Sequence, residues 1–229
     1  MKANVLIIGP SGSGKSSSLR NCDPERTIIL NTEQKALPFR GAAKFAMNIP
    51  ISHYNQFKDT WDSVKKQRKQ GAFQKAIQSD KADVVVVESL TSLNELICRD
   101  LKERNITGFD FWGAFKDEVR NNLIDSKNTP KYVIMTGVDG VVESANGIEE
   151  RIFGIDGSLK KAVEKEFVIT LYTVCIIGDD GEPTYKFITN KQSGYENVPA
   201  KSPACMLPKI MDNDIAEVMR LADEYYTGE

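Results

Sequence analysis

The chain has 229 residues, 41% hydrophobic and 27% charged, so it can bury one substantial core, and we expect a single domain over residues 1–229. Its net charge of −2 excludes a globally basic protein, and any nucleic-acid contact must come from a local patch. Four widely spaced cysteines and one histidine suggest neither a zinc site nor a disulfide framework. The cysteines are expected to be reduced thiols, which predicts a cytoplasmic protein. No stretch reaches transmembrane length, so no membrane partner is expected.

The pattern GxxxxGK[ST] occurs at residues 9–16, between the apolar run 5–8 and a helix-compatible segment at 17–21. In this pattern, glycines let backbone N–H groups curl around a β-phosphate, Lys15 reaches the β- and γ-phosphates, and the Ser16 hydroxyl binds Mg²⁺. The order strand, loop, helix is the one that the motif requires. The sequence therefore predicts a site for a nucleoside triphosphate and Mg²⁺, formed by Gly9, Pro10, Ser11, Gly12, Ser13, Gly14, Lys15, Ser16 and Ser17.

Two predicted strands lead into carboxylates. Residues 27–31 form a buried strand followed closely by Glu33, and residues 84–87 form a run of valines that ends at Glu88. Ligands bind at the C-terminal edge of an open parallel sheet, so Glu33 either faces the nucleotide or is a solvated glutamate in a turn. An apolar strand ending in an acid usually completes such a site, so we expect Glu88 to organise Mg²⁺, and it is also a candidate to polarise the attacking water.

A weak strand at 45–48 and a surface helix over residues 54–68 are expected between these strands. The helix is predicted because apolar residues recur at helical spacing, at Tyr54, Phe57, Trp61 and Val64. The basic cluster from Lys65 to Lys69 either faces solvent or contacts a phosphate backbone.

Helices are predicted over residues 90–103 and 111–124. A buried strand over 132–137 follows, in which Thr136 either senses the γ-phosphate or simply ends the strand. The glycine-rich residues 138–157 are predicted to form a long loop, and loops of this length in compact domains are usually functional or disordered.

The rest of the chain contains a helix start, a hairpin and a terminal helix. We expect them at residues 157–163, at 166–176 paired with 184–189, and at 214–226. An irregular segment separates the hairpin from the last helix, for which Asn213 or Asp212 is the expected N-cap.

The order of these features resembles the core of the RecA-type recombinases, and the run VVVVESL resembles that family's strand LIVVDSV, with Glu88 in place of an aspartate. The resemblance implies an α/β, RecA-like P-loop NTPase fold with a mostly parallel central sheet, flanking helices and a C-terminal antiparallel hairpin extension. It divides the chain into a nucleotide-binding core at 1–137, a DNA-binding loop at 138–157, and a C-terminal hairpin and helix at 158–229.

The same resemblance implies roles for single residues. A glutamate in the position of Glu33 acts on the attacking water in this family, and a planar side chain in the position of Arg40 lies against adenine. The family's glutamine after the strand is replaced here by Gly137-Val138-Asp139. Candidate DNA contacts in and after the loop are Arg151, Lys160 and Lys161.

More closely, NTEQKALPF, VVVVESLTSL and the tail motifs AKSP, MDNDI and YY look like the short phage-encoded AAA/RecA-like ATPases, core-only recombinases of the single-strand-annealing group. This implies a Mg²⁺-dependent ATPase in the host cytoplasm that binds single-stranded DNA, with a single-strand DNA-binding protein as a further partner. RecA-type sites usually lie between subunits, which implies a homo-oligomer on DNA or ATP. Candidates for the cation supplied by a neighbour are Lys191, Lys201 and Arg151, and plain surface residues are the alternative.

Two other classes fit the phosphate loop. A nucleoside-monophosphate or other small-molecule kinase uses a similar loop, although the chain has no arginine-rich lid segment. An ATP-switched interaction module without hydrolysis is the third possibility. A GTPase is disfavoured, because residues 190–193 lack the aspartate that recognises guanine.

Overall fold

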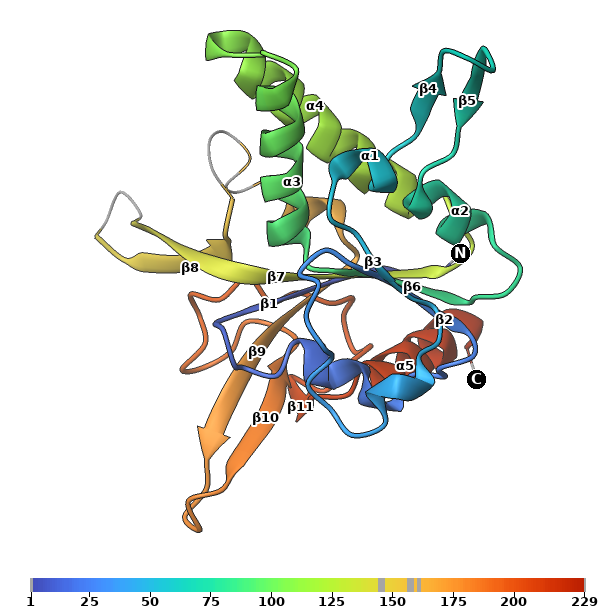
Figure 1. Cartoon of the computed structure of the whole chain (residues 1–229). Helices are drawn as coiled ribbons and strands as arrows, with labels where there is room; N and C mark the ends of the chain where they lie inside the picture. Colours follow the sequence, from blue (N-terminus) through green and yellow to red (C-terminus); the bar gives the residue numbers. More distant parts are fainter. Residues whose placement is uncertain (1, 144–146, 156–158, 160–161, 229) are drawn as a thin grey trace.

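Helices cover both faces of one central sheet (Figure 1). The computed structural model describes residues 2–143, 147–155, 159 and 162–228. One face carries four helices, α1 Tyr54–Phe57, α2 Ala72–Gln78, α3 Leu90–Glu103 and α4 Gly108–Lys127. The opposite face carries α5 Ile215–Thr227 and a short 3-10 helix after the phosphate loop, Ser16–Asn21.

The strands follow the order β11-β10-β9-β1-β7-β6-β2-β3, and β8 pairs with β7. All neighbours from β9 to β3 are parallel, and these strands are β1 Asn4–Gly9, β2 Thr27–Asn31, β3 Asn48–Pro50, β6 Val84–Glu88, β7 Tyr132–Glu143 and β9 Ile169–Ile177. The antiparallel strands are β8 Glu149–Phe153, β10 Pro183–Ile188 and β11 Ile210–Asp212. This arrangement confirms the predicted α/β fold of RecA-like P-loop type.

The hydrophobic core lies on both faces of the sheet, because side chains alternate along each strand. On β1, Leu6 and Ile8 belong to the cluster under α1 to α4, whereas Val5 and Ile7 belong to the cluster that includes α5 residues. Strands covered on both faces read as continuous apolar runs, which is why the sequence revealed β1, β2 and β6.

The predicted helices 90–103 and 111–124 are present, the first with the expected bounds and the second longer at both ends. The last helix is present too, but its N-cap is Asp214, whose Oδ1 accepts from Ala216 N at 3.0 Å, so the expectation of Asn213 or Asp212 was wrong. The weak strand expected at 45–48 is displaced, because β3 begins at Asn48. Among the described residues, no helix combines the length and apolar character needed to cross a membrane.

The helix predicted over residues 54–68 is wrong. The helical turn α1 ends at Phe57, and the chain then forms a hairpin of β4 Thr60–Asp62 and β5 Gln67–Lys69. Asp62 Oδ1 accepts from the backbone N–H of residues 64 and 65, both at 3.0 Å, which closes the turn. Of the four apolar residues at helical spacing, Tyr54 and Phe57 are buried, whereas Trp61 is 68% and Val64 is 90% exposed.

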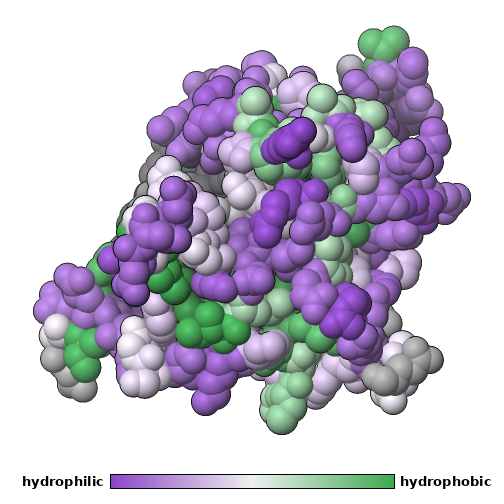
Figure 2. Space-filling view, turned by 90° about the horizontal axis from the view of Figure 1, so that it is seen from below, coloured by the Kyte–Doolittle hydropathy of each residue, from purple (hydrophilic) through white to green (hydrophobic). Residues whose placement is uncertain are grey.

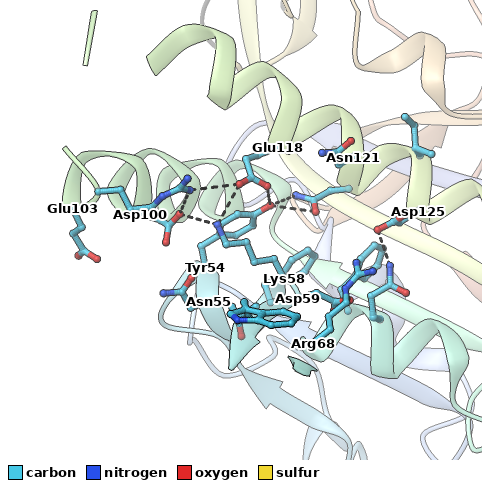
Figure 3. A pocket seen from close by; sticks show the side chains of 18 residues that line it. Tyr54, Asn55, Lys58, Asp59, Arg68, Asp100, Glu103, Glu118, Asn121 and Asp125 are labelled. Carbon is cyan, nitrogen blue, oxygen red and sulfur yellow. Dashed lines mark hydrogen bonds and ion pairs between the residues drawn. The ribbon is translucent and has the colours of Figure 1, made fainter. Parts of the chain in front are cut away.

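Lys58 fixes the point at which the chain leaves α1. Its Nζ donates to Asp100 Oδ2 at 2.9 Å and to Glu118 Oε1 at 3.2 Å, which ties the end of α1 to α3 and α4. Figure 3 shows this network in the wall of a polar cavity of about 800 Å³, bounded on its far side by the β4–β5 hairpin. The hairpin thus stands away from the helices and projects from the body (Figure 1).

The expected loop at 138–157 is largely a second hairpin. Strand β7 does not stop at residue 137 but continues to Glu143 and pairs with β8, from Asp139↔Phe153 to Glu143↔Glu149. Gly154 meets the backbone of β7 so closely that a Cβ there would lie 2.8 Å from Val138 O, which explains the glycine. Residues 144–146 and 156–158 lie outside the described residues, as does much of the helix start expected at 157–163.

The β4–β5 hairpin predicts that substitutions at Phe57 and Val64 differ in their effect on the stability of the protein. Phe57 is fully buried and stacks on Phe73 with ring centroids 4.9 Å apart, so Phe57→Ala should cost about 3–5 kcal/mol of unfolding free energy. Val64→Lys should change it by less than about 0.5 kcal/mol, because Val64 is solvated. Urea unfolding followed by circular dichroism measures both, and a large loss in Val64→Lys would contradict the hairpin.

Candidate functional site

The phosphate loop connects β1 to the 3-10 helix and is shaped by glycines. Gly12 and Gly14 have φ angles of 77° and 96°, which side chains rarely adopt. A Cβ on Gly9 would lie 2.2 Å from Thr173 Oγ1, and one on Gly14 would lie 2.9 Å from the Tyr185 ring. Strands β9 and β10 therefore pack directly on the loop, and only glycine fits at these contacts.

Lys15 arches over the loop that carries it. Its Nζ donates to the carbonyl oxygens of Gly9 at 2.8 Å and Pro10 at 2.7 Å. Burial lowers the pKa of Lys15, while the carboxylates of Glu88, Asp139 and Glu33 act in the opposite direction. A phosphate group offers this ammonium stronger, charged acceptors than two carbonyls do.

Glu88 ends β6 and is 5% exposed. One oxygen of its carboxylate accepts from the Ser16 hydroxyl, and the other accepts from Thr136 Oγ1 at 2.7 Å. Burial raises the pKa of Glu88, and the hydrogen bonds from the two hydroxyls lower it. The structure thus brings together four of the residues selected from the sequence, Lys15, Ser16, Glu88 and Thr136.

Glu33 lies on the same edge of the sheet, just after β2. The backbone N–H of Glu33 donates to Glu88 O at 3.3 Å, and its carboxylate forms an ion pair with Lys35 at 3.2 Å. The charge of Glu33 acts on both Glu88 and Lys15. Its side chain is 28% exposed, so it can meet a water molecule at the edge of the site.

Arg40 is exposed on the segment between β2 and β3. Among the described residues, none forms a hydrogen bond or ion pair with Arg40, so its place against adenine stays a prediction.

Sequence reasoning missed part of the site. Asp139 has a side chain only 5% exposed, and its Oδ2 accepts from Tyr172 OH at 2.9 Å and from Arg151 Nη1 at 3.1 Å. Thr173 and Tyr185 also contact the loop, as described above. Asp139 follows a predicted strand, and Thr173 and Tyr185 lie on predicted strands. Their polar or aromatic side chains near the C-terminal edge of the sheet were the signal from which a role in the site could have been predicted.

The three candidates for a cation acting on a neighbouring subunit are gathered in one place. Arg151, Lys191 and Lys201 line a cavity of about 320 Å³ beside β8, together with Glu164 and Glu150. Burial lowers the pKa of Lys201, whose backbone pairs with Thr170. Two candidate DNA contacts, Lys160 and Lys161, lie outside the described residues.

The side chains present fit a nucleotide with Mg²⁺. Magnesium is usually bound by one or two protein groups and completes its shell with water and substrate phosphates. Ser16 supplies a hydroxyl oxygen and Glu88 a carboxylate within hydrogen-bonding distance of each other. Among the described residues, no group of three or more His, Cys, Asp or Glu could hold a metal by itself.

The buried charge of Glu88 predicts a pH-dependent effect of Glu88→Gln on nucleotide-free protein. Burial raises the pKa of Glu88 in the folded protein above its value in the unfolded chain. Above the folded-state pKa, the buried carboxylate is charged and lowers the free energy of unfolding; this loss disappears as the pH falls and the carboxylate is protonated. Glu88→Gln should therefore raise the urea midpoint near neutral pH, and the gain should shrink as the pH falls. Glu25→Gln, at an exposed position, serves as control. A gain that grows on acidification would contradict the assignment.

Comparison with known families agrees with this geometry. The family model AAA_24, described as an AAA domain, matches residues 1–202, which span the sheet from β1 to β10. Among curated proteins, none matches the sequence. The match includes the phosphate loop, Glu88 and the hairpin that packs on the loop. The chain therefore belongs to the AAA domain family of nucleotide-binding P-loop ATPases.

Proposed function

We propose that this protein is a Mg²⁺-dependent ATPase of RecA-like type that binds single-stranded DNA and serves recombination or annealing of phage type. The observation that carries the hydrolytic part is the convergence of Lys15, Ser16, Thr136 and the buried Glu88 at the edge of three adjacent parallel strands. Glu33 adds a partly solvated carboxylate beside them. Two acids of different exposure suit hydrolysis, because one can organise a cation and the other can contact water.

Each residue then has a chemical task. Lys15 exchanges the carbonyls of Gly9 and Pro10 for the β- and γ-phosphates and neutralises their charge. Ser16, with Glu88 beside it, would hold Mg²⁺, which would supply further positive charge at the phosphates. Glu33 orients the attacking water and takes its proton. The oxygen of water bonds to the γ-phosphorus, the bond from that phosphorus to the bridging oxygen breaks, and ADP leaves.

The hairpin of β7 and β8 supports the DNA-binding part of the proposal. It continues the strand that carries Thr136, so the nucleotide site and the hairpin share one element. Arg151 lies on it, 45% exposed, and Val141 is 46% exposed. A hairpin at the nucleotide edge with a cation and exposed apolar residues suits a nucleic-acid contact.

An apolar patch supports self-association. On β9, β10 and β11, Ile176, Ile177, Tyr185 and Ile210 are between 36% and 63% exposed. Figure 2 shows the face below the sheet, where apolar side chains gather within a largely hydrophilic surface. Because Tyr185 also packs on Gly14, a neighbouring subunit on this patch would lie close to the phosphate loop.

A single-strand DNA-binding protein is the further partner that we propose.

The catalytic assignment is tested by phosphate release with and without single-stranded DNA. Lys15→Ala should lower the rate roughly a hundredfold or more, because it removes charge stabilisation of the transition state. Glu33→Gln should also lower it roughly a hundredfold, because it removes the group that orients water. Lys81→Ala, at an exposed position after α2, is the control. Normal turnover in either site variant would refute the mechanism, and transfer of phosphate to an added nucleoside monophosphate would indicate a kinase.

Self-association is tested by native mass measurement in the presence of ATP, Mg²⁺ and an oligonucleotide. Ile177→Asp should shift the protein from oligomer to monomer, because a charge in an apolar contact must be desolvated. Val64→Asp, at a site that is more exposed and lies on another part of the molecule, should leave the mass distribution unchanged. If Ile177→Asp assembles like the unaltered protein, the patch is not the interface.

A further inference from the structure

A groove opens between α3 and the first turns of α4, beside the end of β8. It has a volume of about 450 Å³, and its walls include Asn94, Arg99, Lys102, Trp112, Phe115 and Ile155. The groove is distinct from the phosphate site but adjoins it. Thr91, in the first turn of α3, also lines the groove and accepts a hydrogen bond from Val138 N at 3.0 Å, two residues after Thr136.

Trp112 forms one wall and is 50% exposed. Its ring meets Phe111 and Phe115 edge to face, with centroids 5.3 Å and 6.2 Å apart and interplanar angles of 88° and 87°. These contacts fix the orientation of the indole while half of its surface stays in solvent. A fixed and exposed aromatic ring is a platform on which a planar group can stack.

Asn94 lines the groove, is 7% exposed, and has both polar atoms of its amide buried. Neither the nitrogen nor the oxygen of its amide has a hydrogen-bond partner. Buried amides are nearly always paired, so this exception requires an explanation. A rotation of this side chain toward the groove would present a donor and an acceptor side by side, the pair that matches the edge of a nucleobase.

Two cations stand at the rim. Arg99 and Lys102 are exposed on α3 three residues apart, and neither forms an ion pair with a described residue. Glu95, also exposed, is the acid on this wall, so the groove carries more positive than negative charge within a chain whose net charge is −2. Unpaired cations beside an aromatic platform complement a phosphodiester.

From these features we propose that the groove binds one nucleotide of single-stranded DNA. The base stacks on Trp112 with its edge toward Asn94, and the flanking phosphates lie against Arg99 and Lys102. This inference rests on the proposed DNA-binding function and adds a site separate from Arg151, Lys160 and Lys161. A peptide without acidic side chains would also fit the aromatic wall, but it would leave the two cations without a partner.

The experiment uses the two tryptophans of the chain, both exposed, as probe and matched control. In a Trp61→Phe background, Trp112 is the sole tryptophan, and an oligothymidylate should quench its emission. Fluorescence anisotropy of a labelled oligothymidylate should show binding weakened roughly tenfold by Trp112→Ala and unchanged by Trp61→Ala. Circular dichroism checks that both variants are folded.

Two further variants separate a binding role from a structural one. Arg99→Ala combined with Lys102→Ala should weaken binding and reduce the slope of log affinity against log salt by about 1 to 1.5. The pair Lys75→Ala and Lys81→Ala, at two other exposed lysines, should change neither. Asn94→Leu should weaken oligonucleotide binding and yet raise the melting temperature, because it removes unpaired buried groups. A residue with a purely structural role would not give these opposite signs.

The outcomes distinguish this inference from the function on which it rests. If the unaltered protein binds oligothymidylate and the Trp112 and Arg99/Lys102 variants bind equally well, the groove is not the site, although the proposed function stands. If the protein hydrolyses ATP but binds no oligonucleotide at low salt, both the DNA-binding proposal and this inference are overturned. Quenching of Trp112 by a peptide but not by the oligonucleotide would also overturn it.

Discussion

A carboxylate buried at the end of a strand is costly unless its oxygens are paired, and Glu88 is stabilised by donors from two other parts of the chain. Ser16 follows β1, Thr136 lies on β7, and Glu88 ends β6, so the pairing requires these three strands to be neighbours in the observed order. The register agrees, since Ile7 pairs with Thr136 and Val87 with Met135. The geometry of the site is therefore a consequence of the sheet, and a strand out of order would leave an unpaired charge in the core.

The antiparallel extension is part of the site as well as of the fold. Thr173 on β9 contacts Gly9 and Ser13, and Tyr185 on β10 contacts Gly14, so the phosphate loop is held from the side by strands more than a hundred residues away in sequence. This contact limits the loop to glycine where the strands approach. It also places the exposed apolar patch of β9 to β11 next to the phosphate loop, so the self-association that we propose would take place beside the catalytic edge.

The sequence predicted what local patterns determine. The phosphate loop, the valine strand ending in Glu88 and the helix at 90–103 were all recognisable, because buried parallel strands and amphipathic helices leave direct periodic signals. The segment 54–68 was not, because Trp61 and Val64 follow helical spacing without being buried, and only the turn at Asp62 reveals the hairpin. Contacts such as Tyr172 with Asp139 depend on strand order, which one sequence does not display.

Strand β7 contacts the nucleotide site, helix α3 and strand β8. Within four residues it contacts Glu88 through Thr136, α3 through the N–H of Val138, and both β9 and β8 through Asp139. Lys15 and Asp139 attract each other, so movement of the ammonium toward phosphates changes the charge that Asp139 experiences. Asp139 forms an ion pair with Arg151 of the β7–β8 hairpin. The N–H of Val138 donates to Thr91 in the first turn of α3, the helix that lines the groove. A change at the phosphate loop would therefore reach both proposed DNA contacts through adjacent residues of one strand, and this is the route by which the proposed hydrolysis and DNA binding would be coupled.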